Sequence, residues 1–108
     1  MNLRNLSKTL GLDESDVLDL VDLFLNTCES DIAKVADGIK RDDHQSVADA
    51  AHSIKGASGN MRFQTIYTFA KDIEDNARAQ DLKNAADQLA GIRKELEQIA
   101  AEMKTYRK

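Results

Sequence analysis

The fold is decided by the last quarter of the chain, where residues 81–106 read DLKNAADQLAGIRKELEQIAAEMKTY. Its apolar residues are spaced alternately by three and four positions: Leu82, Ala85, Leu89, Ile92, Leu96, Ile99, Met103 and Tyr106. This spacing puts them on one face of a helix that lies along a nearly parallel neighbour. The stretch therefore predicts one helix of a bundle, beginning at Asp81. We expect its apolar face to form a wall of the core rather than a zipper between two copies.

Helical spacing of apolar residues also recurs upstream, in four segments. A short amphipathic helix is expected over residues 2–10, ended by Gly11. Asp13 is a good N-cap for a long helix that ends near Arg41, and Asp42 or Asp43 caps a third helix. A fourth helix is expected over about 64–79. The apolar stripe of the long helix contains Val17, Leu20, Val21, Phe24, Leu25, Cys28, Ile32, Val35 and Ile39.

These segments predict an all-α fold: an antiparallel up-down-up-down four-helix bundle with a short extra N-terminal helix. Composition agrees, because the chain has no proline and only five glycines and three phenylalanines. Its 108 residues suffice for a single domain, 1–108, with one core.

Charge and composition exclude several classes of function. The net charge of −4 argues against nucleic acid as a partner, because binding to phosphate backbones needs a basic surface. Cys28 is the only cysteine, which excludes an intrachain disulfide, and its place in the apolar stripe indicates a core residue. No apolar run is long enough to span a bilayer, and no signal peptide is visible. We expect a cytoplasmic monomer that does not bind membranes.

The segment whose residues could carry out chemistry is AHSIKGASGN, residues 51–60. At about 100° per residue, His52 points away from the apolar side of the third helix. Lys55, Gly56 and Gly59 lie within about 60° of His52 on the same outward face. Each glycine costs about 1 kcal/mol relative to alanine inside a helix. We interpret the two glycines as bare surface that lets another protein approach the imidazole.

The run His52-x-x-Lys55-Gly56, followed by small residues and Gly59, resembles the signature of the HPt (histidine-containing phosphotransfer) family. The resemblance extends over nearly the whole chain in length, helix number and position of the histidine. It implies that His52 is phosphorylated at Nε2 and exchanges the group with an aspartate of a response-regulator receiver domain. It also implies that Lys55 is the motif lysine and that Gly56 and Gly59 permit close docking.

Two further positions follow from the resemblance. Glu74 falls where the family has an acidic or amide residue that bonds the other ring nitrogen of the histidine. Glu74 also flanks the apolar stripe of its helix, so it is able to reach a neighbouring helix; the alternative is a surface carboxylate paired with Lys71 or Arg78. Many members have a glycine where this chain has Arg62, and we expect Arg62 to affect how the docking surface meets a receiver.

The expected function is a phosphoryl shuttle between a histidine kinase or receiver aspartate and another response regulator, not an enzyme with its own kinase activity. The sequence contains no nucleotide-binding loop. No cofactor is expected on this chain, because the receiver's carboxylates would hold the Mg²⁺ that phosphoryl transfer requires. No metal site is expected either, since His44 and His52 are about 12 Å apart along a helix; His44 is interpreted as a surface residue.

Two alternatives remain at this point. One is a helical adaptor that binds a partner without phosphorylation, although such a protein would be expected to have lost His52 or Lys55. The other is a fragment of a hybrid or chemotaxis kinase, against which the initial Met1 and the clean helix boundaries favour a free-standing protein.

Overall fold

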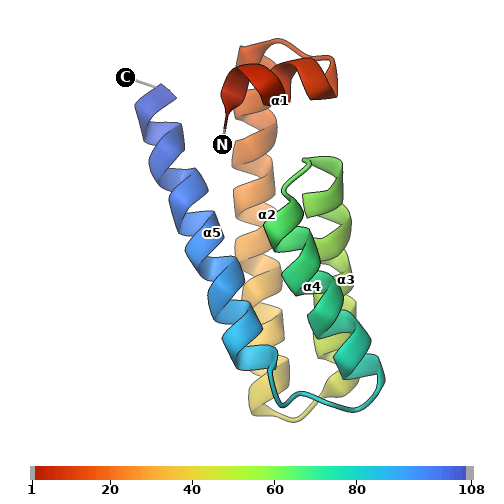
Figure 1. The fold of residues 1–108 in the computed structure, drawn as a ribbon. Coiled ribbons are helices and arrows are strands. Elements are labelled where there is room, and N and C mark those ends of the chain that lie inside the picture. Colours follow the sequence, from red (N-terminus) through yellow and green to blue (C-terminus); the bar gives the residue numbers. More distant parts are fainter. Residues whose placement is uncertain (1, 107–108) are drawn as a thin grey trace.

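Five helices build the fold in the computed structural model, which describes residues 2–106: α1 (Leu3–Leu10), α2 (Glu14–Lys40), α3 (His44–Asn60), α4 (Gln64–Arg78) and α5 (Ala85–Tyr106). Helices α2 to α5 alternate in direction and form a bundle, and α1 crosses one end of it (Figure 1). The predicted all-α bundle with a short extra N-terminal helix is therefore confirmed.

The core lies where the apolar stripes of the four long helices meet. Around the bundle, α2 contacts α3 and α5, and α4 contacts the same two helices; α3 and α4 form the most extensive pair. Beyond the ends of α3 and α4, α2 continues beside α5 and contacts α1 (Figure 1). Within residues 2–106, no helix combines the length and the apolar character needed to cross a membrane.

Most of the predicted apolar stripe of α2 is buried, but Leu20 is not. Val17, Val21 and Cys28 are completely buried, as expected for core residues. Leu20 is 36% exposed because it lies at the edge of this stripe, about 100° around the helix from Val21. Leu20 therefore belongs to the predicted stripe but not to the buried core.

Aspartates begin two of the long helices. The side chain of Asp13 accepts a hydrogen bond from the backbone N–H of Asp16 at 2.9 Å, at the start of α2. Asp43 accepts from the N–H of Ser46 at 3.1 Å and from the Ser46 hydroxyl at 2.8 Å. The cap of α3 is therefore Asp43 rather than Asp42, and its bonds satisfy a donor that the helix leaves unpaired.

Helices α2, α3 and α4 end without the glycine that commonly stops a helix. Asp42, Arg62 and Gln80 occupy the left-handed region there, with φ of 53°, 63° and 63°. At the end of α3, the N–H of Phe63 bonds the carbonyl of Ser58 at 2.9 Å, and the N–H of Arg62 bonds that of Gly59 at 3.2 Å. This is the Schellman pattern, in which glycine is usually favoured at the position that Arg62 occupies.

The start of the last helix differs from the prediction by four residues, since α5 begins at Ala85 and not at Asp81. The N–H of Asp81 bonds the carbonyl of Asn76 and completes the end of α4. The Asp81 side chain then accepts from the N–H of Lys83 at 2.9 Å, a local turn that competes with helix. Leu82 is half-buried against the core, although it lies in the connection.

Candidate functional site

His52 lies in the middle of α3, on the side that faces α4 and solvent. Its neighbours Ala51 and Ile54 are fully buried, whereas the His52 side chain is 63% exposed. The outward orientation predicted from the helical wheel is therefore found in the structure. An imidazole placed in this way is open to a second protein.

Glu74 of α4 bonds the ring of His52. Its Oε2 lies 2.9 Å from Nδ1, and Glu74 is only 4% exposed. An ionised carboxylate only accepts hydrogen bonds, so Nδ1 must carry the proton and donate it. The bond therefore selects the tautomer in which Nε2 holds the free electron pair.

Two cations share the carboxylate of Glu74. Nζ of Lys55 lies 2.7 Å from Oε1, while Nη2 and Nε of Arg78 lie 2.8 and 3.2 Å from Oε2. Burial raises the pKa of Glu74, but hydrogen bonds from Lys55, Arg78 and His52 outweigh it and lower the pKa to about 2. Glu74 is consequently an anion at neutral pH.

The structure has the expected bond between Glu74 and the other ring nitrogen, and it gives Lys55 a partner that the sequence did not indicate. Lys55 pairs with Glu74, although the sequence placed it simply beside the imidazole. The alternative for Glu74, a surface carboxylate, is wrong, because Glu74 is buried and contacts His52. The Arg78 pair from that interpretation does exist, whereas Lys71 pairs with Asp75 instead, at 2.7 Å.

The two glycines beside His52 have different surroundings. A Cβ atom built on Gly56 would meet none of the described residues within 4 Å, so Gly56 is bare surface, as expected. A Cβ on Gly59 would lie 3.3 Å from Cδ2 of Tyr67 on α4. The expectation that Gly59 lies wholly outside the helix packing is therefore wrong: its missing side chain also makes room for Tyr67.

Arg62 lies two residues beyond α3, in the left-handed conformation described above. It lines a hollow together with Glu95 and Glu102 of α5. His52 is ten residues earlier, which corresponds to about 15 Å along a helix. The structure thus places Arg62 at the far end of α3 and not in the cluster around His52; its effect on docking remains a prediction.

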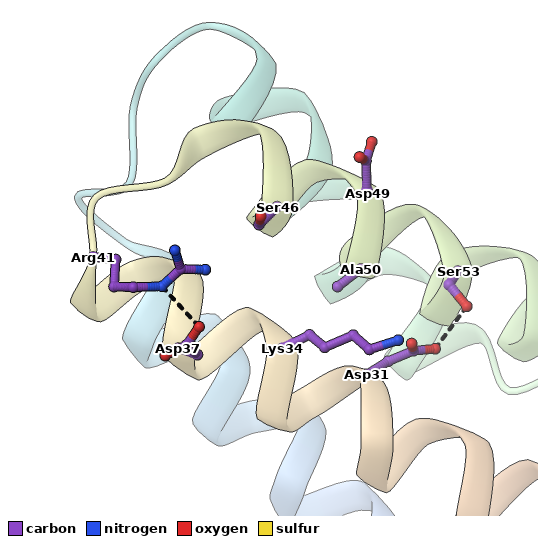
Figure 2. Close-up of a pocket in the computed structure, with 8 residues that line it drawn as sticks. All are labelled: Asp31, Lys34, Asp37, Arg41, Ser46, Asp49, Ala50 and Ser53. Carbon is purple, nitrogen blue, oxygen red and sulfur yellow. Dashed lines mark hydrogen bonds and ion pairs between the residues drawn. The ribbon is translucent and has the colours of Figure 1, made fainter.

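α3 is also bonded to its other neighbour, α2. Ser53 follows His52, and its Oγ donates to Oδ2 of the buried Asp31 at 2.6 Å (Figure 2). Lys34, Asp37, Arg41 and Asp49 line the hollow beside this bond. Ser53 and His52 are about 100° apart around α3, so one of them bonds α2 and the other bonds α4.

The second histidine lies apart from this cluster, at the first position of α3. Nε2 of His44 is 3.7 Å from Oδ1 of Asp42. Over residues 2–106, no three His, Cys, Asp or Glu side chains are grouped so that they would hold a metal ion.

Comparison with known proteins gives two matches. Residues 19–102 match the model of the Hpt domain family. The fold resembles the crystal structure of histidine-containing phosphotransfer protein B (HptB) from Pseudomonas aeruginosa PAO1, with 25% sequence identity and a TM-score of 0.82. That match covers 97% of this chain and 89% of the other. No curated protein matches the chain.

Proposed function

This chain belongs to the Hpt domain family, and on that basis we propose that it carries a phosphoryl group on Nε2 of His52 within a phosphorelay. The observation that supports this most strongly is the bond between the exposed His52 ring and the buried Glu74, 2.9 Å from Nδ1 to Oε2. It leaves Nε2 as the nucleophile and directs it away from the bundle.

The transfer itself is a displacement at phosphorus. The electron pair of Nε2 attacks the phosphorus of an aspartyl phosphate on a receiver domain. The bond from phosphorus to the aspartyl oxygen breaks, and the aspartate leaves as a carboxylate. Nδ1 keeps its proton throughout, so the phosphorylated ring is cationic and the adjacent Glu74 stabilises it. The reverse reaction passes the group to another receiver.

Docking of the receiver uses the bare surface beside the ring. Neither Gly56 nor Gly59 presents a side chain there, although a Cβ atom on Gly59 would contact Tyr67. A partner's active site therefore approaches Nε2 without displacing side chains of α3. In this proposal the receiver's carboxylates hold the Mg²⁺, and a histidine kinase or a receiver supplies the phosphoryl group.

Transfer of label from phosphorylated receiver domains tests the proposal. We expect the wild-type protein to take up ³²P, H52Q to take up none, and H44Q to behave like wild type. H44Q is the matched control because it removes the other histidine of the same helix. Label in H52Q equal to that in wild type would show that another residue accepts the group.

A further inference from the structure

Arg78 is a member of the His52 cluster that the phosphoryl-transfer step described above leaves without a role. It follows Glu74 by one helical turn and directs both Nε and Nη2 to Oε2, the oxygen that also accepts from Nδ1 of His52. Lys55 occupies the other oxygen, Oε1, from α3. One buried carboxylate is thus held from two helices by two cations.

The charges of the cluster explain why two cations are useful. Before phosphorylation, Lys55 and Arg78 face a single anion, Glu74, around a neutral ring. After phosphorylation, the ring is cationic and the phosphoryl group carries about two negative charges. His52 as a whole then adds one negative charge, so the two cations balance it together with Glu74. With either cation missing, the phosphorylated site has an uncompensated negative charge.

The positions of Lys55 and Arg78 suit them to different roles. Lys55 lies three residues after His52 on the same helix, so its flexible side chain reaches the space beside the ring. Arg78 lies on the same helix as Glu74 and donates two hydrogen bonds to Oε2. If Lys55 turned toward a phosphoryl group on the ring, Arg78 would still hold its contact with Glu74.

We propose that Arg78 is a positioning residue: it neutralises Glu74 and keeps it directed at Nδ1 of His52, which releases Lys55 to contact the phosphoryl group. This role rests on the proposed phosphorylation of His52. It predicts that Arg78 matters only while position 74 is negatively charged.

A double-mutant cycle between Glu74 and Arg78 tests the role. The phosphodonor is phosphoramidate, which reacts without a docked protein: Nε2 attacks its phosphorus, the P–N bond breaks, and the nitrogen takes a proton from water and leaves as ammonia. We expect R78Q to slow phosphorylation about ten-fold. In the E74Q background, whose amide oxygen still accepts from Nδ1–H, R78Q should change the rate by less than about two-fold.

The control is K71Q. Lys71 is a cation of the same helix, but it pairs with Asp75 and not with Glu74. The rate of K71Q should equal that of wild type, and circular dichroism checks that every variant is folded. An unchanged rate in R78Q would overturn the role of Arg78. The role would also be overturned if R78Q slowed phosphorylation equally in the E74Q background. If R78Q slowed the reaction only with a phosphorylated receiver as donor, Arg78 would be a docking residue instead. If wild type itself accepts no phosphoryl group from either donor, the proposed function falls as well.

Discussion

Nδ1 of the exposed His52 lies 2.9 Å from Oε2 of Glu74, a residue that is 96% buried in the bundle. The bond connects α3 and α4, the helix pair with the most extensive contact. A ring exposed to solvent thereby takes its orientation from a carboxylate in the helix interface. Glu74 thus links the orientation of the His52 ring to the packing of the bundle.

Removing the acceptor should disturb the tautomer of His52. In E74A, nothing at position 74 accepts from Nδ1, so we expect both neutral tautomers to be populated and phosphorylation to slow about ten-fold or more. E74Q should be milder, because its amide oxygen still accepts the proton. The ¹⁵N chemical shifts of the His52 ring report the tautomer. Shifts in E74A identical to those of wild type would mean that another group orients the ring.

Substitution of three glycines should separate docking surface from packing. G56A fills open space and gains helix propensity, so the free energy of unfolding should rise by up to about 1 kcal/mol. G59A must displace Tyr67 slightly and should gain less. G91A is the destabilising control, because its Cβ would lie 2.7 Å from the Phe69 ring. Urea denaturation measures all three.

At Gly56, a long side chain should weaken receiver binding without affecting stability. G56Q places a long side chain next to His52 without entering the bundle, so we expect weaker receiver binding with no loss of stability. Titration of the receiver by calorimetry measures the affinity. Destabilisation of G56Q comparable to that of G91A would show that Gly56 serves helix packing.

Arg62 adopts the left-handed conformation with φ of 63°, which costs a non-glycine residue about 1 kcal/mol. R62G should therefore stabilise the fold by roughly that amount, as should Q80G, the matched change at the end of α4. Thermal and urea denaturation measure the gain. If Arg62 also contacts receivers, R62G will alter the affinity for receivers and Q80G will not. A loss of stability in R62G would contradict the assignment of Arg62 as a strained residue at the end of the helix.

The pKa of Glu74 predicts a pH dependence of stability. Its donors lower the pKa from 4.5 to about 2 in the folded state, so the ionised form is favoured by folding. This contribution is fully present above about pH 5 and is lost as the pH falls from about 4.5 toward 2. The difference in unfolding free energy between wild type and E74Q should shrink over that range. A difference that stays constant with pH would contradict the assignment.

The helices were predictable because the spacing of apolar residues directly reflects the face that each helix buries. The beginning of α5 was not, because Gln80 stops α4 in a conformation for which glycine is the usual signal. Without that glycine, Asp81 looks like the cap of a new helix, although its backbone N–H completes the previous one. Helix ends of this kind depend on backbone bonds that composition does not reveal.

Within the site, a wheel of one helix was enough to place His52 and Gly56 outside. It was not enough for Gly59, whose surroundings depend on how α4 is rotated against α3; Glu74 was expected to reach the ring, but its burial was not predicted. Tyr67 over Gly59 is a contact between two helices, and the burial of Glu74 has the same origin. The i,i+4 spacing of Glu74 and Arg78 predicted their ion pair. Only the burial of the Glu74 carboxylate gives that pair a role in the site.

The central claim is that His52 is phosphorylated at Nε2 while Nδ1 stays protonated and bonded to Glu74. NMR spectroscopy of the ¹⁵N-histidine-labelled protein after phosphorylation by a receiver measures this directly, through the ³¹P–¹⁵N coupling and the ring nitrogen shifts. We predict coupling of phosphorus to Nε2 of His52 and a protonated Nδ1. Coupling to Nδ1 of His52, or to either nitrogen of His44, would contradict the account.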